Sequence, residues 1–94
     1  METKTIPVRK KDFIWREVDG ETVIISSDNK LMHVLNVTAS MIWLLLDGNH
    51  DQDSIAEIVA AEFGGSMEIV KKDLNDCLEQ LRALNLLEEQ NGYL

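Results

Sequence analysis

Hydrophobic and polar residues follow two different periods along this chain, first that of strands and then that of helices. Short runs rich in β-branched and aromatic residues occupy positions 13–18, 22–26 and 31–35. Asp19-Gly20 separates the first two and is a strong hairpin signal, and the polar residues 27–30 turn the chain again. Connections this short join antiparallel neighbours, so the pattern predicts a three-stranded sheet with the second strand in the centre.

The helical period begins at Asn36, which is a suitable N-cap for a helix over residues 37 to about 47, ended by Gly48. Apolar residues point in nearly every direction around this helix, which is typical of a helix buried at the centre of a domain. Asp51 or Asp53 can cap a second helix, and Gly64-Gly65 stops it.

Ser66 is expected to cap a third and longer helix. One face of it is a continuous apolar stripe, made of Val70, Leu74, Cys77, Leu78, Leu81 and Leu84. Leu86 and Leu87 are expected to close the core. Three strands followed by three helices predict an α+β fold, compatible with a winged-helix-like arrangement in which the sheet comes first.

A chain of 94 residues is expected to form one domain. We expect a flexible basic N-terminal arm over residues 1–12, a folded domain over 13–88 and a loose C-terminal tail over 89–94. The longest unbroken apolar run, Met41–Leu46, is too short to cross a bilayer, and no apolar segment typical of a signal peptide follows the first basic residues. The single cysteine excludes an internal disulfide and fits a reducing cytoplasm, the expected location.

Charge is unevenly distributed. The net charge is −8, yet residues 1–16 carry five basic and two acidic residues, so the remaining chain carries −11. An acidic body repels phosphate backbones, which makes nucleic acid an unfavourable partner.

Candidate catalytic groups do not converge in this sequence. His33 and His50 are isolated, and one cysteine with two separate histidines offers no metal-ligand spacing. Cys77 lies within the apolar stripe of the third helix, where a buried and inert thiol is expected. We therefore predict a protein that is not an enzyme and needs no metal or cofactor.

The third predicted strand is the most informative segment. One of its faces carries Leu31, His33 and Leu35, and the other carries Met32 and Val34, so both faces are largely apolar. As the last strand of a simple meander it also lies at an edge, where unpaired backbone groups can accept another strand. The alternatives are that helices cover both faces, or that two copies pair edge to edge as a homodimer.

An ordered set of residues along the chain resembles the PqqD family. It comprises Leu31-x-His33-x-Leu35-Asn36, Thr38-Ala39, Ile42-Trp43, Leu46, Asp47-Gly48, Ile55, Ile58, Phe63-Gly64, Leu78, Leu81, Leu84 and Leu86-Leu87. The resemblance extends over residues 15 to 88.

The resemblance implies a peptide-binding domain over residues 13–88. PqqD-like domains are recognition elements in pathways of ribosomally made, post-translationally modified peptides. They bind the leader of a precursor peptide as an added strand and present it to a modifying enzyme, often a radical S-adenosylmethionine protein; the founding case serves synthesis of pyrroloquinoline quinone (PQQ). Carried onto this sequence, the groove uses Leu31, Met32, His33, Val34 and Leu35 on the strand, and Asp73, Cys77, Gln80, Leu81 and Leu84 on the third helix.

Two other hypotheses remain. A winged-helix-like adaptor could bind protein or nucleic acid, but residues 66–90 hold six acidic and three basic residues, which is a poor footprint for DNA. The second hypothesis is a subunit or fragment of an enzyme. Against it, the sequence offers no set of catalytic residues that would come together in one site.

Overall fold

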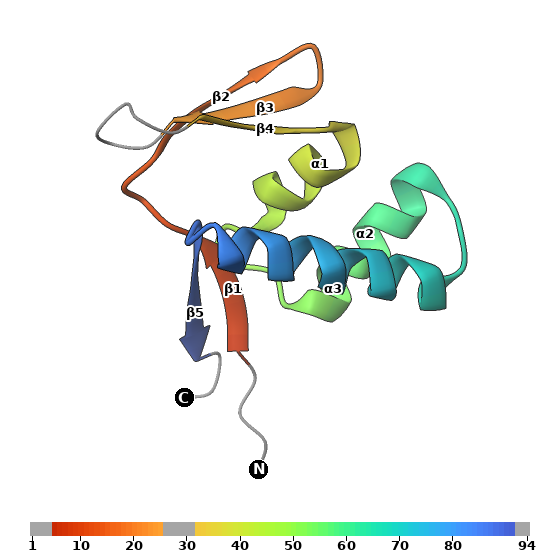
Figure 1. Ribbon diagram of the computed structural model, residues 1–94. Coiled ribbons are helices and arrows are strands. Elements are labelled where there is room, and N and C mark those ends of the chain that lie inside the picture. The colour runs from red at the N-terminus through yellow and green to blue at the C-terminus, as the bar shows by residue number, and fades with distance from the viewer. Residues whose placement is uncertain (1–4, 26–31, 92–94) are drawn as a thin grey trace.

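Three strands and three helices follow the predicted order in the computed structural model, which describes residues 5–25 and 32–91 (Figure 1). Strands β2 (Ile14–Val18), β3 (Glu21–Ile25) and β4 (Met32–Leu35) form an antiparallel sheet in that spatial order. Helices α1 (Val37–Leu45), α2 (Gln52–Phe63) and α3 (Met67–Ala83) follow. The predicted α+β fold with a central second strand is thus confirmed.

Local sequence signals set the limits of these elements. Asp19 and Gly20 both have positive φ, 52° and 84°, as the two central residues of a type I′ hairpin turn require. The side chains of Asn36, Asp51 and Ser66 accept hydrogen bonds from backbone N–H groups in the first turns of α1, α2 and α3. The sequence predicts Asn36 and Ser66 as caps and leaves Asp51 and Asp53 as alternatives for α2, of which Asp51 is the cap.

Helix α1 lies between the three-stranded sheet and α3 (Figure 1). Trp43 in α1 has no exposed surface, and its ring meets that of Trp15 edge-on, with centroids 6.2 Å apart. The helix ends at Leu45, two residues earlier than the sequence suggested, because the N–H of Leu46 bonds to the carbonyl of Trp43 instead of continuing the helical ladder. Leu44 is 41% exposed, so α1 is central without being enclosed on every side.

The core is closed by residues from every layer. Ile24 from β3, Ile55 from α2, Leu78 from α3 and Leu86 after α3 are all fully buried. The predicted role of Leu86 and Leu87 in closing the core is confirmed, since Leu87 is also buried.

A second sheet corrects the expectation of a flexible arm and a loose tail. Strand β1 (Thr5–Arg9) pairs antiparallel with β5 (Leu87–Asn91), so residues 5–9 and 89–91 belong to ordered structure. Pro7 and Val8 are buried there. The two strands are short and come from opposite ends of the chain. No pattern within a few neighbouring residues therefore predicts that they pair. Residues 1–4 and 92–94 lie outside the described residues.

Arg9 ties β1 to the end of α1. Its guanidinium donates to the carbonyls of Trp43 and Leu44, at 2.7 and 3.0 Å, and its Cζ lies 5.1 Å from the centre of the Trp15 ring. The positive charge therefore binds two carbonyls at the C-terminal end of α1, where the helix dipole favours a cation, and stacks on an aromatic face at the same time.

Replacing Arg9 by leucine should lower the free energy of unfolding by about 1–2 kcal/mol, since two charge-assisted hydrogen bonds and the cation–π contact are lost. Urea denaturation followed by circular dichroism measures this. Lys11→Leu is the matched control, because it removes the same charge from an exposed residue nearby. Equal losses in the two variants would show that Arg9 is only a surface charge.

Candidate functional site: the free edge of β4 and its groove

Strand β4 is an edge of its sheet. It pairs with β3 through Thr22–Leu35, Val23–Val34, Ile24–His33 and Ile25–Met32, and within the described residues nothing pairs with its other side. An unpaired edge of this kind offers backbone donors and acceptors to a further strand.

The hairpin turn determines which backbone groups of β4 are free. In a two-residue type I′ hairpin the flanking residues, here Val18 and Glu21, form a mutually hydrogen-bonded pair. Backbone groups alternate in direction along a strand, so Thr22 and Ile24 direct their N–H and C=O groups toward β4.

Their partners on β4 are Leu35 and His33, whose backbone groups therefore face β3. The N–H and C=O groups of Met32 and Val34 consequently point outward from the sheet. Two donors and two acceptors, spaced for an added strand, are available at this edge.

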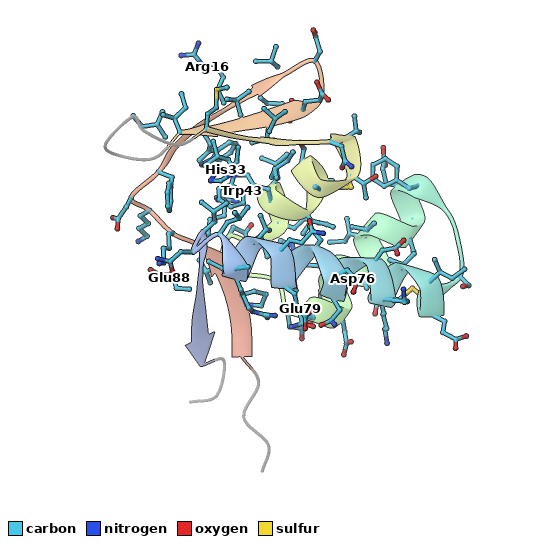
Figure 2. All side chains as sticks on the ribbon, in the orientation of Figure 1. Arg16, His33, Trp43, Asp76, Glu79 and Glu88 are labelled. Atoms are coloured by element: carbon cyan, nitrogen blue, oxygen red, sulfur yellow. The ribbon has the colours of Figure 1, made fainter. Side chains whose placement is uncertain are left out.

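The side chains of β4 alternate as the sequence indicated. Met32 and Val34 are 65% and 57% exposed on the outer face, whereas His33 and Leu35 are half-buried on the face toward the helices. Figure 2 shows Arg16 on the outer side of the sheet and His33 on the side of Trp43. Leu31, the first residue of the expected strand, lies outside the described residues.

A cavity of about 330 Å³ opens directly after β4, between the first turns of α1 and the middle of α3. Its walls are Asn36, Thr38, Ala39 and Ile42 on one side and Asp73, Asp76, Cys77 and Gln80 on the other. An extended peptide paired with β4 would continue past Leu35 into this cavity. The free edge and the cavity together form a site suited to a peptide.

Sequence comparison bears directly on this site. The chain matches the family described as Coenzyme PQQ synthesis protein D (PqqD) over residues 21–87, a range that contains β3, β4, all three helices and the first residue of β5. The chain belongs to the PqqD family. No curated protein sequence matches it.

Two solved structures resemble this PqqD-family chain, and both hold a leader peptide. TbiB1 in complex with the TbiA(beta) leader peptide is 26% identical, with a TM-score of 0.79 over 93% of this chain and 98% of that one. Lasso peptide synthetase B1 complexed with the leader peptide is 16% identical, with a TM-score of 0.78 over 88% and 98% of the two chains. The second likeness establishes the shared fold.

Three of the five residues expected on the third helix of this PqqD-family domain line the cavity: Asp73, Cys77 and Gln80. Leu81 is 2% exposed and belongs to the core, and Leu84 lies exposed at the end of α3. Neither lines the cavity, and their assignment to the groove stays a prediction about the bound state.

Sequence reasoning missed five wall residues, namely Asn36, Thr38, Ala39, Ile42 and Asp76. Asp76 could have been found, because it lies three residues after Asp73 and so on the same face of the helix. The α1 wall residues belong to the family pattern, but their sequence signal, a capped and buried helix, indicates only their place in the fold.

The cavity wall carries acidic side chains and a thiol of low reactivity. Asp73 and Asp76 are exposed at the wall, and Lys72 Nζ lies 3.8 Å from an oxygen of Asp76. Burial raises the pKa of the Cys77 thiol, which keeps the sulfur protonated and weakly nucleophilic at neutral pH. In the ranges 5–25 and 32–91, no group of three or more His, Cys, Asp or Glu residues could hold a metal ion.

None of the described helices is long and apolar enough to span a membrane.

Proposed function

We propose that this PqqD-family chain recognises the leader of a ribosomally made precursor peptide by adding it as a strand to the edge of β4. The outward backbone groups of Met32 and Val34, beside a cavity, are the observation that carries the proposal. The 26% identical TbiB1, seen in complex with a leader peptide, supports it.

Affinity and selectivity come from different parts of this site. Backbone hydrogen bonds to Met32 and Val34 hold any extended segment regardless of its side chains. Every second side chain of that segment points to the same side, toward α1 and α3, where the cavity accepts or rejects it. The site therefore binds a class of extended peptides and selects among them by alternate residues.

In this proposal the chain acts as a peptide chaperone and contributes no catalytic group. A radical S-adenosylmethionine protein or another peptide-modifying enzyme supplies the chemistry, in the cytoplasm where the precursor is made, for PQQ or a related product. A homodimer formed by pairing two β4 edges would use the same donors and acceptors. Dimerisation and peptide binding would then compete.

The nucleic-acid adaptor hypothesis is not favoured. The exposed side of α3 carries Glu68, Asp73, Asp76 and Glu79, and these carboxylates would repel a phosphate backbone.

Hydrogen exchange tests the strand addition directly. In the free protein the amides of Met32 and Val34 should exchange quickly, whereas those of His33 and Leu35, which face β3, should be protected. If a short precursor gene lies beside the gene of this protein, its synthetic leader should slow exchange at Met32 and Val34 by at least about tenfold, since new hydrogen bonds form there.

The opposite edge of the sheet provides the control for this measurement. By the same alternation, Glu17 on β2 also points its N–H away from β3. Its exchange should not change when the peptide binds. Protection that appears at Glu17, or only within β1, would contradict the proposal.

A further inference from the structure

A second cavity, of about 170 Å³, lies where α2 ends and α3 begins. Thr38, Ile42 and Asp73 line both this cavity and the one beside β4. Because the two cavities share these walls, they adjoin each other along α3, and we call the free edge of β4 together with both cavities the groove.

We infer that the leader peptide occupies the whole groove, with an apolar side chain in the second cavity and a basic side chain against Asp73 and Asp76. This inference rests on the proposed function and adds to it the chemistry of the recognised segment.

The second cavity is built for an apolar side chain. Val59, Val70 and Leu74, all at most 7% exposed, line its interior. Phe63 and Ile69 line it as well and are 47% and 60% exposed, so large apolar surfaces remain in contact with water at its rim. Covering them with an apolar ligand side chain would release that water.

Two glycines at the turn between α2 and α3, Gly64 and Gly65, line this cavity. Both have positive φ, 81° and 102°, which favours glycine at these positions. A Cβ placed on Gly64 would have no atom within 4 Å, so the cavity wall there is backbone that faces open space.

The carboxylates at the junction of the two cavities determine which charge on a ligand side chain binds there favourably. Asp73 and Asp76 lie nearly one turn apart on α3, and within the described part of the chain Asp73 has no ion-pair partner. Lys72 balances only Asp76, at 3.8 Å. With a net charge of −8 on the whole chain, a basic ligand residue is attracted here and an acidic one is repelled.

The spacing of the two ligand residues follows from helix geometry. The α3 residues that line the second cavity, from Ile69 to Leu74, are centred about three residues before the midpoint of Asp73 and Asp76. At 1.5 Å per residue this is about 4.5 Å, between the rises of one and two residues of extended chain. A basic and an apolar residue within two positions of each other would therefore fit.

Selection from a random peptide library tests the inference without knowledge of the natural leader. The full-length protein is used to select displayed peptides long enough to span β4 and both cavities. The binders should be enriched in Lys or Arg within two positions of Leu, Ile or Phe. In NMR spectra they should shift the amides of Met32 and Val34 together with those of Phe63 to Ile69.

Two variants at exposed positions then measure each contact in a selected binder. Asp73→Lys and Ile69→Asp should each weaken binding roughly tenfold. Glu79→Lys is the matched charge control on the same helix, and Ile14→Asp, with Ile14 64% exposed on β2, is the matched apolar control. Both controls should change binding by less than about twofold.

The possible outcomes separate the two proposals. Binders that shift Met32 and Val34 but are indifferent to Asp73→Lys and Ile69→Asp would overturn the extended groove and leave strand addition standing. Binders that never shift Met32 and Val34 would overturn both.

Discussion

Replacing Trp43 by alanine is expected to lower the free energy of unfolding by about 3–5 kcal/mol. Trp43 has no exposed surface, and its ring packs edge-on against Trp15. The substitution leaves a cavity where α1 meets the sheet. Domains of this size have a total stability of roughly 5–14 kcal/mol, so the variant should lose a large share of it. Urea denaturation followed by circular dichroism measures the loss.

Trp43→Phe provides the control for ring volume. The buried indole Nε1 of Trp43 has no hydrogen-bond partner within the described part of the chain, so phenylalanine removes a donor that is already unsatisfied. This relief offsets part of the lost packing, and the expected cost is below about 1.5 kcal/mol. A loss under about 1 kcal/mol in the alanine variant would show that α1 is not the packing centre of the domain.

The elements predicted correctly depend on signals within a few residues of one another. A capping side chain at Asn36, Asp51 or Ser66 bonds to an N–H three residues later, and the Asp19-Gly20 turn needs only its own backbone angles. Interactions this local leave a visible pattern in the sequence.

The β1–β5 sheet could not be predicted from such local signals. Its two strands lie at opposite ends of the chain, and the residues that pair, such as Val8 with Glu88, have no shared pattern that would reveal the contact. Arg9 looked like one charge in a basic arm, yet it bonds to two carbonyls of α1. Long-range contacts of this kind depend on how the layers pack and are not encoded in any local period.

The candidate groove was only partly predictable for a geometric reason. The strand follows directly from the order of the elements in the meander. On α3, however, three of the five groove residues that the family resemblance implies, Cys77, Leu81 and Leu84, also belong to the apolar stripe that predicts the core. The structure assigns Leu78 and Leu81 to the core, and the cavity is lined by the flank of the stripe, where Asp73, Cys77 and Gln80 lie. To predict which face of α3 is buried and which lines the cavity, one must know how the helix is rotated about its axis. Tertiary packing determines that rotation.

Proline at Val34 should weaken leader binding by at least about tenfold while the protein stays folded. The N–H of Val34 points away from β3, so its loss breaks no hydrogen bond within the sheet, but it removes a donor that the added strand needs. The carbonyl of the peptide that faces this position is left without a partner. Isothermal titration with the synthetic leader measures the change.

Glu17→Pro is the matched control for strain, because Glu17 also directs its N–H outward, on the opposite edge of the same sheet. Both variants should lose a similar, small amount of stability, and only Val34→Pro should lose binding. His33→Pro should instead destabilise the fold by roughly 3 kcal/mol, since the N–H of His33 bonds to β3. If Val34→Pro binds the leader as well as Glu17→Pro does, the edge of β4 is not where the peptide docks.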